Sequence, residues 1–239
     1  MCLILFAISP LSSYRLIVAA NRDEYYARPT RPAMFWPENT QILAGKDLSM
    51  GGTWMGITRS GRFAAITNLR GAPRHETHTS SRGQIPKKYL ESSESPKAYL
   101  DKLTKSLKEF EDFNLLIGNG KDYYYFNSQS SNILQLSAGF YGLSNQLLNC
   151  NWPKVQLGKE QLKTAVNSDK MEQNLFQILS NTGDERPFSG SFIAASAYGT
   201  RSKTILTWSD DEELKFTEKS YTQGGKPGIT KHISFSISL

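Results

Sequence analysis

Hydrophobic residues open the chain in two short runs that a polar connector separates. The runs cover residues 3–8 and 16–20, and the connector reads Ser9-Pro10-Leu11-Ser12-Ser13. Runs of this length bounded by turn residues predict an antiparallel β-hairpin. The first strand of a hairpin starts where the second one finishes, so we expect Cys2 and Asn21 to be neighbours at one end of the sheet.

The same pattern predicts further strands, with helices between them. A capping serine followed by proline, Ser95-Pro96, predicts a helix that carries apolar residues to Phe110. Two more helices are expected over residues 152–166 and 171–179, and residues 70–95 are expected to form a long functional loop that leads into the first helix. Residues 28–32 are expected to be extended because of their two prolines. The remaining strands are expected over residues 54–58, 63–67, 113–117, 123–126, 133–136, 204–208, 214–217 and 232–237.

This order of elements indicates a fold class. Blocks of antiparallel strands with intervening helices predict α+β layers and argue against a doubly wound parallel sheet. No linker, repeat or low-complexity tract divides the 239 residues, so residues 1–239 are expected to form a single domain.

Composition excludes several classes of protein. The net charge of +6 is spread along the chain and accompanies no nucleic-acid-binding motif, so nucleic acid is not an expected partner. Only Cys2 and Cys150 are present, which excludes a disulfide framework and fits a reducing compartment, so a cytoplasmic location is expected. The apolar start lacks a positive n-region and is broken at Pro10, which argues against a cleaved signal, and no stretch is long enough for an integral membrane segment.

Cys2 is the main candidate for chemistry. Removal of the initiator methionine would give this residue both a thiol nucleophile and a free α-amine that can act as its base. The alternative is that Cys2 is the first member of a buried strand, since free cysteine packs as a small hydrophobe.

The string Asn21-Arg22-Asp23-Glu24 lies where the hairpin brings it to the thiol. Arg22 would favour the thiolate, and Asp23 would hold the α-amine in place. The alternative is an ordinary polar strand end, where exposed ion pairs contribute little.

Other polar residues also follow predicted strands. Asn145 could donate to the oxyanion that forms when a thiolate attacks a carbonyl, or it could be a simple turn residue. Asn68 and Arg70 close the strand before them, and Arg201 precedes another strand. Polar strand ends of this kind suit a pocket over a sheet edge, but every antiparallel sheet has them.

The loop after Asn68 carries histidines and arginines. His75 and His78 are three residues apart, but they sit in a Pro-, Ser- and Thr-rich stretch without a matching cluster, so no metal site is expected. Arg70, Arg74 and Arg82 form a basic patch that could hold a carboxylate or phosphate.

Taken together, the motifs resemble the NRDE family, which includes the transport and Golgi organization 2 proteins. The resemblance covers nearly the whole chain. It rests on Met1-Cys2-Leu3-Ile4, Asn21-Arg22-Asp23-Glu24, Gly51-Gly52-Thr53-Trp54, Thr67-Asn68, Ser81-Arg82-Gly83, Gly142-Leu143-Ser144-Asn145 and Tyr198-Gly199-Thr200-Arg201-Ser202.

The resemblance implies a fold of the N-terminal-nucleophile hydrolase kind, a four-layer αββα sandwich of two antiparallel sheets covered by helices. Its cysteine branch, the bile-salt hydrolase and penicillin-V acylase group, implies hydrolysis of a non-peptide amide through a Cys2 thioester. That branch has an arginine three positions before its aspartate, where this chain has Ala20, and Arg22 is the adjacent cation. The resemblance implies that Cys2 is the nucleophile, Asp23 orients its amine, Asn145 forms the oxyanion hole and Arg201 is a supporting cation. The candidate catalytic residues are therefore Cys2, Arg22, Asp23, Asn68, Asn145 and Arg201, and the candidate ligand-binding residues are Asn21, Glu24, Trp54, Arg70 and Arg82.

The family also implies alternatives to catalysis. Its members are linked to Golgi organization and secretion, to haem trafficking and to lipid metabolism, with mitochondrial association in eukaryotic relatives. The same pocket could therefore belong to a non-catalytic carrier of haem or acyl-CoA, or the chain could be a secretion factor. No cofactor is expected to be required, and haem would be a carried ligand.

Overall fold

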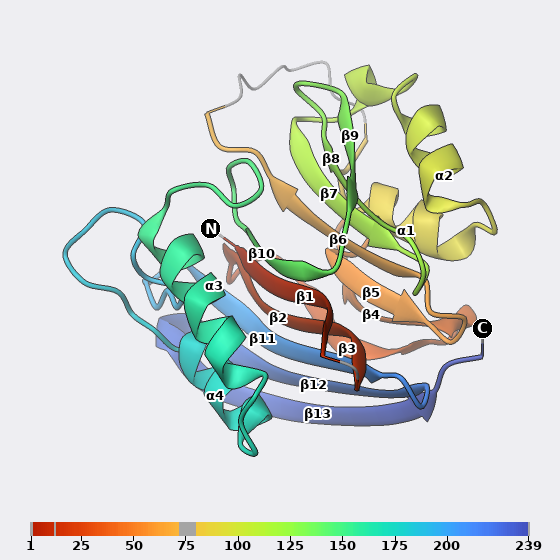
Figure 1. Cartoon of the computed structure of the whole chain (residues 1–239). Helices are drawn as coiled ribbons and strands as arrows, with labels where there is room; N and C mark the ends of the chain where they lie inside the picture. Colours follow the sequence, from red (N-terminus) through yellow and green to blue (C-terminus); the bar gives the residue numbers. More distant parts are fainter. Residues whose placement is uncertain (1, 12, 72–79, 239) are drawn as a thin grey trace. The chain divides into compact units, whose positions relative to one another are not determined.

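The computed structural model describes residues 2–11, 13–71 and 80–238, and it divides into two compact units (Figure 1). The first unit contains residues 1–28, 138–144 and 148–236, and the second contains residues 29–137, 145–147 and 237–239. Each unit is built on one antiparallel sheet, so the expected α+β class is confirmed. That the whole chain acts as a single domain stays a prediction.

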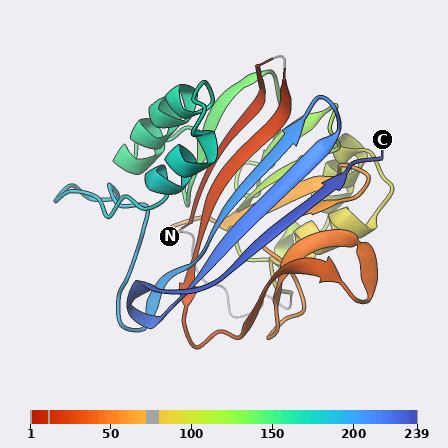
Figure 2. The ribbon, with the colours of Figure 1, turned by 90° about the horizontal axis from the view of Figure 1, so that it is seen from below.

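The first unit has a six-stranded sheet within the described part of the chain, in the order β10-β1-β2-β11-β12-β13. Two helices, α3 and α4, lie against one face of this sheet (Figures 1 and 2). The elements are β1 (Leu3–Leu11), β2 (Tyr14–Tyr25), β10 (Gly139–Leu143), α3 (Pro153–Ala165), α4 (Met171–Ile178), β11 (Tyr198–Ser209), β12 (Glu213–Thr222), the short helix η2 (Gln223–Gly225) and β13 (Lys226–Ser236).

The second unit has a seven-stranded sheet, counted over the described residues, in chain order from β3 to β9. Helices α1 and α2 pack on it. The elements are β3 (Thr30–Trp36), β4 (Asn39–Asp47), β5 (Met55–Thr58), β6 (Phe63–Asn68), α1 (Gln84–Glu91), α2 (Pro96–Leu103), the short helix η1 (Leu107–Glu109), β7 (Phe113–Gly118), β8 (Tyr123–Asn127) and β9 (Asn132–Leu136).

The hairpin predicted at the start of the chain is confirmed. Strand β1 pairs antiparallel with β2, and Leu3 lies opposite Asn21. Cys2 therefore stands at the end of β2 that carries Arg22 and Asp23. Strand β11 completes the surroundings by pairing with the other edge of β2, with Thr200 opposite Asp23.

An apolar core between the sheet and its helices supports this end of the first unit. Leu3, Leu5 and Ala7 alternate along β1 toward a buried cluster that includes residues of α3 and α4. Helix α3 approaches the sheet closely at Gly158, where an added Cβ would lie 2.8 Å from Leu5 Cδ1. A side chain at position 158 would push α3 away from β1, so glycine sets this close packing.

The predicted loop over residues 70–95 is wrong in part, because it contains helix α1. Ile85, Tyr89 and Leu90 recur with the spacing of a helix face and are buried in the core of the second unit. Burial of this stripe stabilises the helix, whereas the many polar residues around it led to the prediction of a loop.

Helix α2 is shorter than predicted. Ser95 caps its N-terminus by accepting the Ala98 N–H at 3.3 Å, as expected. However, the helix ends at Leu103; the Thr104 hydroxyl donates to the Asp101 carbonyl at 2.8 Å, and at Ser106 the backbone has left the helical φ/ψ region. Hydroxyl side chains of this kind compete with the backbone ladder.

Strands β3 and β4 were not predicted beyond the extended segment at residues 28–32. Strand β3 lies at the edge of its sheet, and its register with β4 shifts between Arg31 and Met34, around Pro32. An edge strand tolerates proline because one side needs no ladder hydrogen bond. Among the described residues, no helix has the length and hydrophobicity that a membrane span requires.

The core packing gives a stability prediction. Leu5 is fully buried beneath α3, so Leu5→Ala should lower the free energy of unfolding by about 3 kcal/mol through lost burial and a residual cavity. Leu157→Ala is the matched control, because Leu157 lies on α3 but is 44% exposed. Urea denaturation measures the free energy of unfolding of both variants. Equal losses for Leu5→Ala and Leu157→Ala would contradict the close packing of α3 on Leu5.

Candidate active site at the end of strand β1

The Cys2 side chain lies against the backbone of Asp23. Its sulfur accepts the Asp23 N–H at 3.5 Å, and its thiol points to the Asp23 carbonyl at 3.8 Å. Cys2 is partly exposed, whereas Asp23 is 5% exposed. The neighbourhood of thiol and aspartate that the hairpin predicted is therefore present.

The Asp23 carboxylate is fixed from the opposite strand. The Thr200 hydroxyl donates to Asp23 Oδ1 at 2.7 Å, and Thr200 is fully buried. The same hydroxyl accepts the Ile193 N–H at 3.0 Å, so its orientation is set by the backbone. Tyr198 donates its hydroxyl to the Asp23 carbonyl at 3.3 Å. Asp23 is thus held in one position by side chains of β11.

Ser144 holds the backbone of Cys2. Its hydroxyl donates to the Cys2 carbonyl at 2.6 Å, and the residue is fully buried at the end of β10. Ser144 and Thr200 were present in the motifs read from the sequence, but no role was predicted for them. Their positions opposite Cys2 and Asp23 follow from strand pairing across β10-β1-β2-β11, which the sequence did not give.

The electrostatic surroundings favour the thiol form of Cys2. Crowding by protein atoms raises the pKa of the Cys2 thiol above its ordinary value, and the Asp23 carboxylate acts in the same direction. The Asp23 N–H and the Arg22 guanidinium lower that pKa, but burial outweighs them. A thiol in this environment needs a base before it can act as a nucleophile.

Lys154 is a further ionisable residue of this region, and no role was predicted for it from the sequence. It lies in the first turn of α3 and is 1% exposed. Burial lowers the pKa of its amine, and the negative charges at Asp23 and Cys2 oppose that shift. A signal was present in the sequence, because Lys154 occupies the same helical stripe as Gly158, Leu162 and Ala165, where an apolar residue is expected.

Arg22 and Glu24 form a charged pair beside the thiol. Arg22 is 7% exposed, and its guanidinium lies 3.9 Å from Glu24 Oε2. Arg28 reaches the same carboxylate oxygen at 4.0 Å. Glu24 therefore balances two arginines, and the predicted influence of Arg22 on the thiol is present as a lowering effect on the Cys2 pKa.

Arg201 lies in a bulge of β11. Thr200 and Ser202 pair with consecutive residues of β2, which leaves Arg201 without a partner position. Its Nη1 donates to the carbonyls of Tyr25, Tyr26 and Arg28 at 3.0–3.2 Å. The bulge thus turns the Arg201 guanidinium toward the end of β2 and the segment after it, and the three hydrogen bonds hold that segment in place.

Asn21 ties the helical layer to the sheet. Its amide donates to the carbonyls of Leu179 at 2.9 Å and Ser191 at 2.7 Å. These bonds hold the end of α4 and the loop before β11 against β2. A ligand-binding role for Asn21 stays a prediction.

The second unit brings together another part of the predicted set. The Asn145 amide donates to the Asn68 carbonyl at 2.9 Å, and the Asn145 carbonyl accepts the Arg70 N–H at 2.8 Å. Asn145 is 6% exposed, and its side-chain oxygen has no hydrogen bond to any described residue. The catalytic roles of Asn68 and Asn145 stay predictions.

Trp54 and Arg82 have partners of their own in the second unit. The Trp54 ring packs over Gly45, where an added Cβ would lie 2.2 Å from it. Arg82 pairs with Glu111 at 3.0 Å and donates to the Asp112 carbonyl at 3.3 Å. Of the predicted basic patch, Arg74 lies outside the described residues, as do His75 and His78.

Loss of the Thr200 hydroxyl should destabilise the protein. Thr200→Val removes the hydrogen bond to a buried carboxylate, so the free energy of unfolding should fall by about 1.5–3 kcal/mol. The exposed Thr230→Val on β13 serves as control. Denaturation in urea compares them, and a Thr200→Val cost no larger than that of the control would argue against an anchored Asp23.

The raised thiol pKa should be visible in alkylation kinetics. In Cys150→Ser protein whose Met1 is retained, the rate of Cys2 reaction with iodoacetamide should be lower at neutral pH than that of an unstructured cysteine peptide. The rate should also keep rising above the pH at which the peptide has levelled off, because the folded thiol ionises later. A midpoint at or below that of the peptide would contradict the assigned environment.

Comparisons with known proteins agree on a family and a fold. Residues 1–223 match the family described as Transport and Golgi organisation 2. The chain is 32% identical to the Transport and Golgi organization 2 homolog of Mus musculus and 34% identical to that of Bos taurus, each alignment covering 92% of this chain and 93% of the relative.

Solved structures give the fold. The Caenorhabditis elegans N-acylethanolamine-hydrolyzing acid amidase ortholog superposes with a TM-score of 0.52 at 11% identity, over 86% of this chain and 92% of that one. A mutant conjugated bile acid hydrolase from Clostridium perfringens superposes with a TM-score of 0.54 at 8% identity, over 99% and 92%. The N-terminal-nucleophile hydrolase-like fold expected from the sequence is confirmed. By its match over residues 1–223 and by these relatives, the chain belongs to the Transport and Golgi organisation 2 family.

Proposed function

We propose that this protein is a cysteine N-terminal-nucleophile hydrolase that cleaves a non-peptide amide. The observation that carries the proposal is the pairing of the Cys2 thiol with Asp23, whose carboxylate is anchored by Thr200 at 2.7 Å. Two solved structures with this fold are named for an acid amidase and a conjugated bile acid hydrolase. The latter is a mutant in which the cysteine at position 2 of that protein is replaced. The present chain also has its candidate nucleophile, Cys2, at position 2.

The reaction would begin at the N-terminus. Once Met1 is removed, the α-amine of Cys2 takes the thiol proton and the sulfur attacks the amide carbonyl. Collapse of the tetrahedral adduct forms a thioester and expels the amine of the substrate, which receives the proton. Water then attacks the thioester, and the α-amine of Cys2 again acts as the base. This step releases a carboxylic acid and restores the thiol.

The surroundings of Cys2 suit this sequence of proton transfers. Burial keeps the thiol protonated at rest, so a base within the same residue has a proton to remove. The Asp23 carboxylate would hold the new α-amine, and Ser144 would keep the Cys2 carbonyl turned away from the substrate. Lys154 shares these electrostatic surroundings, because burial lowers the pKa of its amine and the negative charge of Asp23 opposes that shift.

The direct test uses amide substrates and an acyl-enzyme assay. A panel of N-acylethanolamines and bile acid conjugates should include a substrate whose turnover falls at least about a thousandfold in Cys2→Ser and Cys2→Ala. Intact mass after rapid acid quenching should show the acyl adduct on the unmodified protein. Cys150→Ser is the control and should retain turnover, whereas activity indifferent to replacement of Cys2 would end the proposal.

The state of the N-terminus decides between this function and its alternative. Intact mass of the protein purified from its own host at native level should show that Met1 is absent. A retained Met1 would leave Cys2 without its base and would contradict the proposed mechanism. In that case the carrier function would be tested by titration with haem, read as a Soret shift, and by thermal stabilisation with acyl-CoA.

A further inference from the structure

A groove lies in the first unit at the opposite end of the β1–β2 hairpin from Cys2. It consists of two adjoining cavities of about 400 and 410 Å³ that share Tyr14, Thr207 and Lys215 in their walls. We call it the Tyr14 groove. Cavities of this size accommodate small organic molecules. We propose that the Tyr14 groove binds a linear organic cation of the polyamine class.

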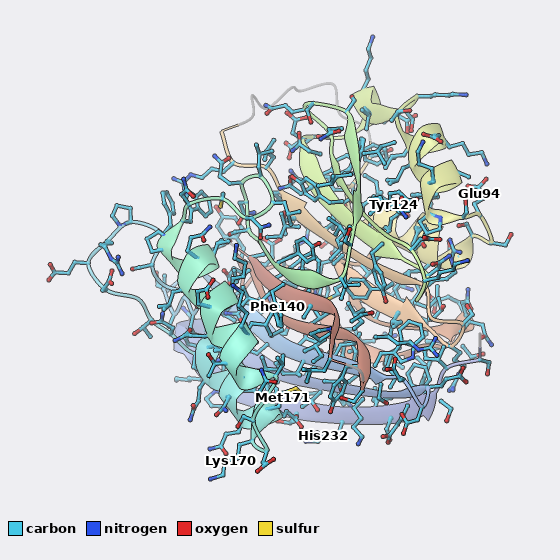
Figure 3. The ribbon with its side chains drawn as sticks, in the orientation of Figure 1. Glu94, Tyr124, Phe140, Lys170, Met171 and His232 are labelled. Carbon is cyan, nitrogen blue, oxygen red and sulfur yellow. The ribbon has the colours of Figure 1, made fainter. Side chains whose placement is uncertain are left out.

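The carboxylates of the groove gather at its two ends. Asp169, just before α4, and Glu172, in its first turn, line only the first cavity. Asp210 and Asp211, in the turn between β11 and β12, and Glu213, the first residue of β12, line only the second. Figure 3 marks Met171, which lies between the first two carboxylates in the sequence and lines the same cavity. A ligand with an amine at each end and a flexible stem between them matches this distribution.

Negative charge predominates in the Tyr14 groove although the whole chain carries a net charge of +6. Five carboxylates and one amine line it, and that amine, on Lys215, is already paired with Glu213 at 3.0 Å. Arg15 lies 3.6 Å from Asp210 and offsets part of the charge at that end. Asp169 and Glu172 have no ion pair with a described residue. The first cavity is therefore the stronger attractor for a cation.

Thr207 supplies an independent indication of a ligand. It lies in the wall common to both cavities and is only 9% exposed. Its hydroxyl makes no hydrogen bond with any described residue. Thr207 pairs with Ile17 and Lys215 in neighbouring strands, and Ile17 belongs to the helix-facing core, so its side chain stands on the face that bears the groove. An acceptor held in the middle of the groove suits an internal ammonium group.

The remaining walls fit the stem of such a molecule. Val166, Met171 and Ile205 give the first cavity an apolar side, and the Tyr14 ring lies where the two cavities meet. Methylene groups would bury against these side chains, and a cation near the ring face gains further attraction. A bare metal ion fits less well, because among the described residues no three metal-ligating side chains converge.

The test is titration of the full-length protein with spermidine, followed by amide NMR shifts and by calorimetry at low and high salt. Shifts should concentrate on residues of the Tyr14 groove, and affinity should fall as salt rises, because the contacts are charged. Butylamine, which has only one amine, should bind more weakly than spermidine if both ends of the groove are used.

Variants separate a built site from diffuse attraction. Asp169→Asn with Glu172→Gln should weaken binding at least about threefold, as loss of exposed charge contacts predicts. Thr207→Val, which changes no charge, should weaken it by about threefold through the lost acceptor. Glu160→Gln, on α3 outside the groove, removes one of the two charges that the double variant removes and should change little. Absence of binding at millimolar spermidine, or an equal effect of Glu160→Gln, would overturn the proposal.

Discussion

The antiparallel register between β1 and β2 is the constraint on which the candidate site depends. It sets Leu3 opposite Asn21 and so brings Cys2 to the backbone of Asp23. Side chains alternate between the two faces of a strand, and Leu3, Leu5 and Ala7 are committed to the helix-facing core. A slip of one residue would expose this core and turn Cys2 to the wrong face. The packing of α3, close at Gly158, therefore protects the position of the thiol.

Strand β11 adds the second constraint, because it determines what the aspartate can do. Thr200 anchors the carboxylate, and Tyr198 reaches the Asp23 carbonyl. The bulge at Arg201 directs a cation to the chain beyond β2. The result is a carboxylate and a thiol held rigidly, with a buried amine on Lys154 in the same electrostatic environment. Rigid placement of this kind is what the proposed amide hydrolysis would require of its reacting groups.

Much of this arrangement could be read from the sequence, but the contributions of distant strands could not. Short apolar runs bounded by turn residues predicted the first hairpin and the strands from Phe113 to Leu136, because local pattern determines these pairings. Strand β3 was not predicted because its prolines and charged residues are untypical of a strand, although they are tolerated at the edge of a sheet. Helix α1 was not predicted because its apolar stripe is short and lies within a polar stretch of sequence.

The site shows the same division. Cys2 and Asp23 could be placed together from a hairpin alone. Thr200 and Ser144 could not be assigned, since their partners depend on which strands become neighbours of β1 and β2. Lys154 was readable in principle as a charged residue on an apolar stripe, but helix spacing does not reveal what its amine faces.

The anchoring of Asp23 by Thr200 also has a consequence for the timing of maturation. Chains are synthesised at about 5–20 residues per second, so about 10 to 40 s separate the appearance of Cys2 from that of Thr200. During this interval β2 has no β11 to pair with, and the start of the chain remains accessible outside its final surroundings. Under the proposed function, the peptidase that removes initiator methionines would cleave the Met1–Cys2 bond before the pocket around Cys2 exists, so the rate of synthesis would influence how many molecules gain a free α-amine.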